Sequence, residues 1–232
     1  MLDQAFELLQ KYTWGDDRNV LNAIDEAIVE SHGDAAARSK LEKRLIAVLQ
    51  SDATRNGKDF VCRKLKAIGS EESVSVLAEM LSDKDHSHMA RYALQEMEIP
   101  AAGKALLDSL SSVPAEQKIG VMGSLGARGE SGAVSALAAM LNDSDAHIAK
   151  SAAMALGAIR TPDAMKALSE SKQNAEIKHA VLDSQFACLE KMLADGDKTG
   201  ALMGYKKLSK EEGLAKHFKV AATRGMLACA GR

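Results

Sequence analysis

Aromatic residues are scarce in this chain of 232 residues, and so is proline. Phe, Trp and Tyr together make up 3% of the sequence, although hydrophobic residues of all kinds make up 46%. The core must therefore consist of Ala, Val, Leu, Ile and the 11 Met, and both Ala and Met favour helices. With only three prolines, long helical stretches are allowed. The composition favours an all-α protein.

Long apolar runs and a cysteine framework are also missing. No segment approaches the roughly 18 consecutive apolar residues of a membrane-spanning helix. The first seven residues lack the basic and apolar regions of a secretory signal. Cys62, Cys188 and Cys229 are odd in number and far apart in helical apolar patterns, so we expect buried, free thiols. We predict a cytoplasmic protein without a membrane partner. The alternative of a secretory signal peptide that has been removed stays open, because its removal would leave the same sequence.

Catalytic motifs are close to absent. The sequence has no Gly-x-Ser-x-Gly, no His-Glu-x-x-His, no Gly-x-Gly-x-x-Gly and no phosphate-binding Gly-x-x-x-x-Gly-Lys-Ser/Thr. His86 and His88 are two residues apart at an expected helix start, so their side chains diverge by about 200°. We therefore expect no catalytic residue, no metal site and no cofactor, and we predict that the protein is not an enzyme.

The positive signal is an internal repeat with an offset of 60 residues. When residues 61–85 are laid over residues 121–145 without a gap, 12 of the 25 positions are identical. The identical pairs include Leu65/Leu125, Gly69/Gly129, Val74/Val134, Leu77/Leu137, Met80/Met140, Leu81/Leu141, Asp83/Asp143 and Asp85/Asp145. Repetition at a fixed period is typical of stacked helical repeats.

Each 60-residue unit contains two expected helical hairpins of about 30 residues. In the first, a helix over 59–68 ends at Gly69, which we expect to be a left-handed C-terminal stop. Ser70 and the acidic residues after it predict a capping box for the next helix. In the second, a helix at 119–125 precedes a turn region at 126–132. Pro100 and Thr161-Pro162 predict further helix starts, and outside the clear repeats we expect helices at 2–11, 20–31, 34–50, 177–193, 199–208 and 218–229.

Two stretches of these hairpins resemble bacterial HEAT repeats. They are residues 81–94 (Leu-Ser-Asp-Lys-Asp-His-Ser-His-Met-Ala-Arg-Tyr-Ala-Leu) and 143–159, which ends Met-Ala-Leu-Gly-Ala-Ile. The second helices at 74–81 and 134–141 also fit, with their shared Val-x-x-Leu-x-x-Met-Leu. The resemblance implies an all-α, right-handed α-solenoid (superhelix) of about five to seven hairpins. It also implies an acid–base ladder from Asp85 to Arg91 and from Asp145 to Lys150.

The resemblance varies along the chain. It is clear over residues 57–170, whereas 1–56 is expected to be an N-terminal helical cap or divergent repeats. Residues 171–232 are expected to be divergent C-terminal HEAT-like repeats, and a truncated last repeat is one interpretation of this segment. Gln95-Glu96 stands where the family pattern has Leu-Gly, which departs from the uniform repeat.

In HEAT arrays the second helices line the concave surface, and this implies a surface for binding other proteins. We therefore predict a non-enzymatic protein–protein interaction or scaffold module, whose partner is a protein or a neighbouring domain of a longer chain. The candidate binding residues are the polar residues expected on the exposed side of these helices: Glu72, Glu79, Lys104, Asp108, Ser135 and Lys166.

A second set of candidates favours an alternative function. Arg63, His88, Arg91 and Tyr92 fall on first helices of adjacent hairpins, where they would converge across the stack. Such a set suits a module, resembling phycobilin-lyase-type repeats, that binds a small ligand or assists an enzyme in a larger multi-domain protein. HEAT-like iron hydroxylases use His-Glu pairs, and no His-Glu dipeptide occurs here.

Charge is distributed unevenly along the chain. The net charge is −2 overall; residues 1–170 carry 19 basic and 25 acidic side chains, whereas residues 171–232 carry 11 and 7. The C-terminal segment is therefore basic by four charges, which suits an acidic partner. The overall balance lacks the basic footprint of a nucleic-acid-binding protein or of a HEAT-like DNA glycosylase, so no nucleic-acid partner is expected.

Overall fold

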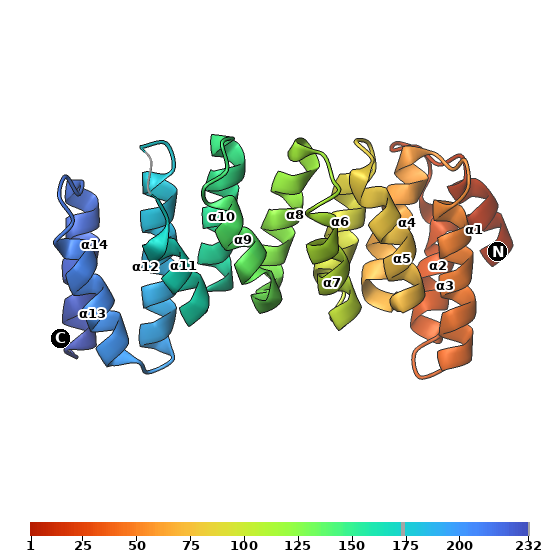
Figure 1. Cartoon of the computed structure of the whole chain (residues 1–232). Coiled ribbons are helices and arrows are strands. Elements are labelled where there is room, and N and C mark those ends of the chain that lie inside the picture. The colour runs from red at the N-terminus through yellow and green to blue at the C-terminus, as the bar shows by residue number, and fades with distance from the viewer. Residues whose placement is uncertain (173–174, 232) are drawn as a thin grey trace. The chain divides into compact units, whose positions relative to one another are not determined.

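The computed structural model describes residues 1–172 and 175–231, and within these ranges every regular element is a helix (Figure 1). The chain divides into two compact units, Met1–Ser124 and Leu125–Arg232. Within each unit, consecutive helices form hairpins that stack on one another, so the predicted all-α solenoid of HEAT-like hairpins is confirmed. None of the described helices combines the length and the apolar character that crossing a membrane requires.

The first unit contains two kinds of stacked helix. The first helices α4 and α6 pack side by side, and so do the second helices α5 and α7. The helices that lie wholly in this unit are α1 (Leu2–Leu9), α2 (Asn22–Glu30), α3 (Ala35–Leu49), α4 (Arg55–Ile68), α5 (Glu71–Glu79), α6 (Ser87–Glu96) and α7 (Pro100–Ser109). Helix α8 (Ala115–Arg128) contains the boundary between the units.

The second unit continues the pattern. First helix α10 packs along α12, second helix α9 packs beside α11, and α13 contacts both α12 and α14. The bounds are α9 (Val134–Met140), α10 (Ala146–Ile159), α11 (Pro162–Glu170), α12 (Lys178–Ala194), α13 (Lys198–Ser209) and α14 (Lys216–Cys229). The predicted helices at 177–193, 199–208 and 218–229 correspond to α12, α13 and α14.

Two predicted turns are wrong. Gly69 follows α4 with φ −65° and ψ 147°, so it is extended rather than left-handed. Helix α8 continues to Arg128, which places Gly126 inside the helix, and the left-handed residue after it is Gly129 with φ 66°. Both glycines lie near the end of an apolar pattern, but Gly69 marks a helix end whereas Gly126 marks a close contact between helices.

The predicted helix starts are mostly confirmed. The Thr161 hydroxyl accepts a hydrogen bond from the Ala164 N–H at the start of α11, and Pro162 occupies the first turn. Pro100 begins α7 in the same way. Ser70 caps α5 by accepting from the Glu72 N–H. The capping box is wrong, however, because the third helical position is Ser73 rather than a glutamate.

The start of α5 is instead held by Glu42 from α3. Its side chain is buried, with 4% of its surface exposed. One carboxylate oxygen accepts from the Ser70 N–H at 2.6 Å, from the Ser70 hydroxyl at 2.9 Å and from the Ser73 hydroxyl. An anion at a helix N-terminus is favoured by the orphan N–H groups and the helix dipole. Glu42 thus links two successive hairpins through buried hydrogen bonds.

Glu42→Ala is expected to lower the free energy of unfolding by about 2 kcal/mol, because hydrogen bonds to a buried charged acceptor are lost together. Urea denaturation followed by circular dichroism measures the change. The control Glu72→Ala removes an exposed carboxylate 3.9 Å from Lys43 and is expected to cost about 0.5 kcal/mol or less. Equal effects of the two substitutions would contradict the role given to Glu42.

Successive first helices of the second unit approach each other at glycines. A Cβ atom added at Gly157 of α10 would lie 2.5 Å from the Ser184 Cβ and 2.7 Å from the Ser184 Cα of α12. A Cβ added at Gly126 of α8 would lie 3.0 Å from the Ala155 Cα of α10. Both glycines follow a leucine, so the Leu-Gly ending of the repeat permits the close approach of neighbouring first helices.

Gly157→Ala is expected to destabilise the protein by about 1–3 kcal/mol, since α10 and α12 must separate to make room for the methyl group. Gly123→Ala in α8 is a matched control, because a Cβ there meets no atom within 4 Å. It is expected to stabilise the protein by about 0.5–1 kcal/mol through higher helix propensity. Midpoints of thermal unfolding that move in the same direction for both variants would refute the packing argument.

Candidate functional site

A shallow groove runs between the second helices α5 and α7 of the first unit. Its volume is about 400 Å³. Small side chains form most of its lining, among them Ser75, Ala78 and Ala105, and Lys104 and Asp108 stand at its edge. Lys104 and Asp108 are both exposed and form an ion pair of 2.5 Å along α7. Two of the predicted concave-face residues therefore lie at this groove.

An equivalent groove lies between α9 and α11 of the second unit. Its volume is about 280 Å³, and its lining includes Ala138, Ala167 and the predicted residue Lys166. Glu170 lies four residues after Lys166, just as Asp108 follows Lys104. Lys104 and Lys166 are 62 residues apart, in register with Pro100 and Pro162 at the two helix starts. The same Lys-x-x-x-acid pattern thus borders both grooves, and the 62-residue register of the helices that begin at Pro100 and Pro162 was the signal that could have identified Glu170.

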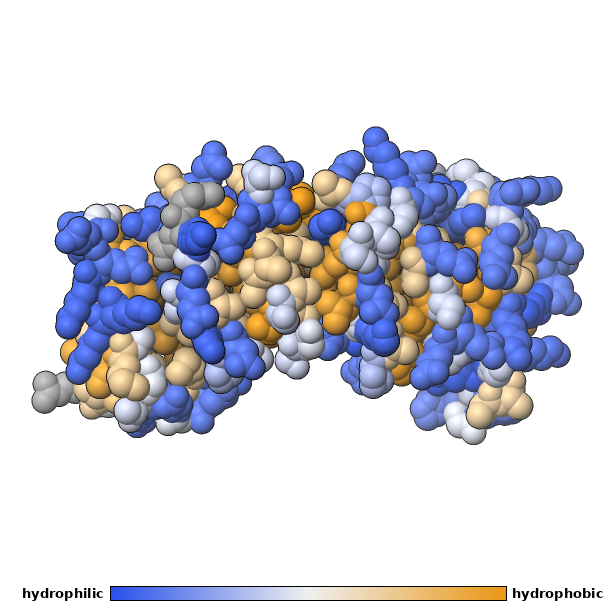
Figure 2. Space-filling view, viewed as in Figure 1, coloured by the Kyte–Doolittle hydropathy of each residue, from blue (hydrophilic) through white to orange (hydrophobic). Residues whose placement is uncertain are grey.

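The other predicted residues of the second helices are exposed but lie outside these two grooves. Glu72 and Glu79 are on α5, and Ser135 is on α9. Glu72 is 3.9 Å from Lys43 of α3. Figure 2 shows this face of the molecule, with hydrophilic side chains over α13 and weakly hydrophobic residues at α9.

The predicted first-helix set forms two separate pairs. The guanidinium carbon of Arg63 lies 5.8 Å from the centre of the Tyr92 ring, and Arg63 also pairs with Asp59 at 3.0 Å. Arg91 lies 3.0 Å from the His88 Nδ1 and donates to the Ser124 hydroxyl at 3.2 Å. The four side chains therefore do not meet around one point.

The predicted acid–base ladder is wrong. Arg91 turns away from Asp85 and lies against α8, where a Cβ at Gly120 would come within 2.6 Å of its Nε. The missing side chain at Gly120 leaves space for the guanidinium, and burial lowers the pKa of Arg91. Asp145 accepts from the His147 N–H as the cap of α10. Over residues 1–172 and 175–231, no ion pair joins it to Lys150.

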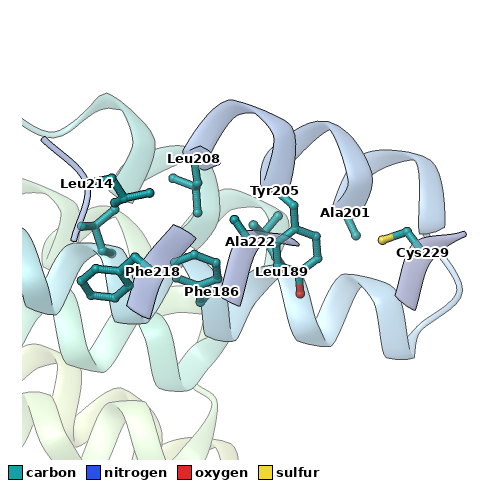
Figure 3. Packing of buried hydrophobic residues seen from close by; sticks show 10 residues of the cluster. Phe186, Leu189, Ala201, Tyr205, Leu208, Leu214, Phe218, Ala222 and Cys229 are labelled. Carbon is teal, nitrogen blue, oxygen red and sulfur yellow. The ribbon is translucent and has the colours of Figure 1, made fainter. Parts of the chain in front are cut away.

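The sequence did not predict a larger cleft, which lies between α12 and α14 in the second unit. Its volume is about 560 Å³. Phe186 and Phe218 stack with ring centres 5.7 Å apart and planes 3° apart, and the Tyr205 ring is 6.1 Å from Phe186 (Figure 3). Three of the eight aromatic residues of the chain thus meet here. Aromatic residues are scarce in this sequence, so their clustering near the C-terminus was the signal that could have indicated the cleft.

Tyr205 is held as a neutral phenol at the bottom of this cleft. Burial raises its pKa to about 12, and the nearby Glu190 and Cys229 act in the same direction. A phenol with this pKa stays protonated at physiological pH and keeps its O–H as a hydrogen-bond donor. The cleft therefore combines an aromatic floor with one polar donor.

The cysteines are buried, free thiols, as predicted. Burial and the nearby Asp59 carboxylate raise the pKa of Cys62 to about 12, and burial raises the pKa of Cys188 to about 11. Because the thiolate is the reactive species, these two side chains are poor nucleophiles. Among the residues that the structure describes, no group of three or more His, Cys, Asp or Glu side chains is arranged to hold a metal ion.

Cys62 and Cys188 of the native protein are expected to resist a disulfide reagent at pH 8, since both burial and raised pKa values suppress the thiolate. In denaturant the normal thiol pKa returns and both residues react. The absorbance of the released aromatic thiolate follows the reaction, with cysteine-to-serine variants to assign each phase. Rapid native labelling of Cys62 or Cys188 would contradict the burial described above.

Comparison with known proteins identifies the repeat. Residues 103–184 match a family model described as HEAT repeats. The predicted resemblance to HEAT repeats is therefore confirmed over these residues. No curated protein matches the sequence.

One similar solved structure is that of human deoxyhypusine hydroxylase in complex with glycerol. The two sequences are 14% identical, the match covers 100% of this chain and 96% of that chain, and the TM-score is 0.40. A likeness of this degree says nothing about the activity of this chain.

Proposed function

We propose that the protein is a non-enzymatic interaction module that binds a protein partner, or a neighbouring domain of a longer chain, through its second helices. The observation that carries the proposal is the repeated groove at α5–α7 and α9–α11. Each has small residues on its floor and a lysine followed four residues later by a carboxylate at its edge. HEAT repeats at residues 103–184 support it, because such arrays form extended binding surfaces.

The binding mechanism follows from the shape of these grooves. They are shallow and their linings include several small residues, alanine and serine, so a partner side chain gains modest apolar contact at each one. Exposed charge pairs contribute little to affinity by themselves but select a partner of complementary charge and raise the association rate. Affinity would come from several such contacts in succession rather than from one deep pocket.

The alternative of a small-ligand module that assists an enzyme rests on the four first-helix residues. A single binding point requires Arg63, His88, Arg91 and Tyr92 to converge. The contacts among them are an Arg63–Tyr92 pair and an Arg91–His88 pair, which give this alternative less support than the repeated grooves give the interaction module.

Substitution of the lysines at both grooves tests the proposal. The variant Lys104→Glu/Lys166→Glu keeps the shape of each groove but reverses the charge at its edge. We expect pull-downs from source-cell lysate at moderate salt to capture at least about tenfold less partner. The new glutamates would repel the acidic groups of the partner that the lysines attract. Quantitative mass spectrometry identifies the partner and measures the amount.

The control Lys84→Glu/Lys219→Glu changes the net charge equally at two exposed lysines outside both grooves. This variant is expected to retain the partner at the wild-type level. Equal loss in both variants, or a wild-type bait that captures no discrete protein, would refute the proposed interface.

A further inference from the structure

The cleft between α12 and α14 has the form of a channel between two helices. Both helices run in the same direction, and α13 returns between them (Figure 1). Its lining follows α12 from Asp183 to Leu193 and α14 from His217 to Ala228. At 1.5 Å per residue, these walls are about 15 Å long, or three helical turns. Helix α12 packs closely along α10 on its other side but touches α14 over a much shorter stretch.

The floor of the cleft is apolar and already well packed. Phe186 and Phe218 line the cleft, are 7% and 4% exposed, and have stacked rings (Figure 3). A Cβ at Gly225 would lie 2.4 Å from the Tyr205 ring, so glycine lets α14 lie directly over the tyrosine. Ala187 and Ala221 on the two walls are small and leave the channel open above the rings.

The two edges carry opposite charges at helical spacing. Asp183 and Glu190 lie seven residues apart on α12, and His217 and Arg224 lie seven residues apart on α14. All four are exposed. In the part of the chain that the structure describes, no ion pair connects the two edges across the cleft. The acidic edge and the basic edge are therefore both available to a third element.

We propose that this cleft binds an amphipathic helix of a partner protein. Its apolar stripe would lie in the channel against the half-buried side chains of Ala187, Leu193 and Ala221. Basic residues on one flank would face Asp183 and Glu190, and acidic residues on the other flank would face Arg224. A spacing of seven residues is two helical turns, so one helix lying along the channel meets both carboxylates of the acidic edge. This site belongs to the first helices and is independent of the grooves in the proposed function.

A helix fits the cleft better than a small molecule does. Asp183 and Glu190 lie about 10 Å apart along the acidic edge, which matches the repeat of a helix rather than the size of a compact ligand. The channel is open above its buried floor, since the charged residues at its edges are exposed while the aromatic rings below them are buried. Such a site offers apolar burial for affinity and two charged edges for orientation.

A designed peptide tests the proposal with the full-length chain. The probe is a fluorescein-labelled 18-residue alanine-based helix, about six residues longer than the channel walls. Leucines follow one face at alternating spacings of three and four, with lysine on one flank and glutamate on the other, each repeated after seven residues. We expect saturable binding by fluorescence anisotropy and a gain in peptide helicity by circular dichroism.

Arg224→Glu makes both edges acidic, and we expect it to weaken binding of this peptide about tenfold. Lys219→Glu is the matched control: it makes the same charge change at an exposed residue of α14 that does not line the cleft. It is expected to change binding by less than about twofold. A peptide with lysine on both flanks should regain the lost affinity with Arg224→Glu, because both edges then attract it.

Several results would overturn the proposal. One is the absence of saturable binding to the wild-type chain, whose fold is checked by its circular dichroism spectrum. Another is equal weakening by Arg224→Glu and Lys219→Glu, which would place the peptide elsewhere. A dye such as anilinonaphthalene sulfonate that binds the cleft and is not displaced by the peptide would assign the cleft to small apolar ligands. Self-association of the chain that Ala221→Trp abolishes would assign it to a second copy.

Discussion

The close approach of successive first helices is the constraint on which the rest of each unit depends. A thirty-residue hairpin cannot bury its apolar stripe alone, so each hairpin must lie against the next. In the second unit the contact is made by glycine, Gly126 on Ala155 and Gly157 on Ser184. In the first unit the apolar contact is joined by side-chain hydrogen bonds: Ser124 donates to Gln95 at 3.1 Å, and Lys66 donates to the Tyr92 hydroxyl at 3.0 Å. Neighbouring first helices are thus joined by close glycine contacts in the second unit and by side-chain hydrogen bonds in the first unit.

This packing decides which surfaces remain for binding. First helices bury much of their side chains against one another, whereas the shorter second helices leave shallow grooves between them, each with alanine and serine in its lining. The contact between α12 and α14 is the departure from close packing, and Phe186, Tyr205 and Phe218 fill the space that a direct helix contact would otherwise occupy. The shallow grooves and the aromatic cleft therefore both follow from how closely neighbouring helices pack.

The sequence predicted the features that are local or periodic. The repeat offset predicted the hairpins, and Thr161, Pro162 and Pro100 predicted helix starts, because these signals act within one turn of the chain. The acid–base ladder failed because Arg91 is positioned by Gly120, which lies 29 residues away on another helix. Glu42 was missed for the same reason, since its acceptor role depends on Ser70 and Ser73. Side-chain partners across hairpins depend on packing that periodicity does not describe.

The two proposed surfaces recognise a partner by different physics. At the second-helix grooves, exposed pairs such as Lys104 with Asp108 are screened by solvent and salt, so they favour the choice of partner over affinity. In the α12–α14 cleft, covering the half-buried side chains of Ala187, Leu193 and Ala221 removes apolar surface from water at about 25 cal/mol per Å², which favours affinity. A partner that presents both a charged face and an amphipathic helix would use each surface for what it does best. The Lys-x-x-x-acid pattern would then determine which protein binds, and the aromatic cleft would slow its dissociation.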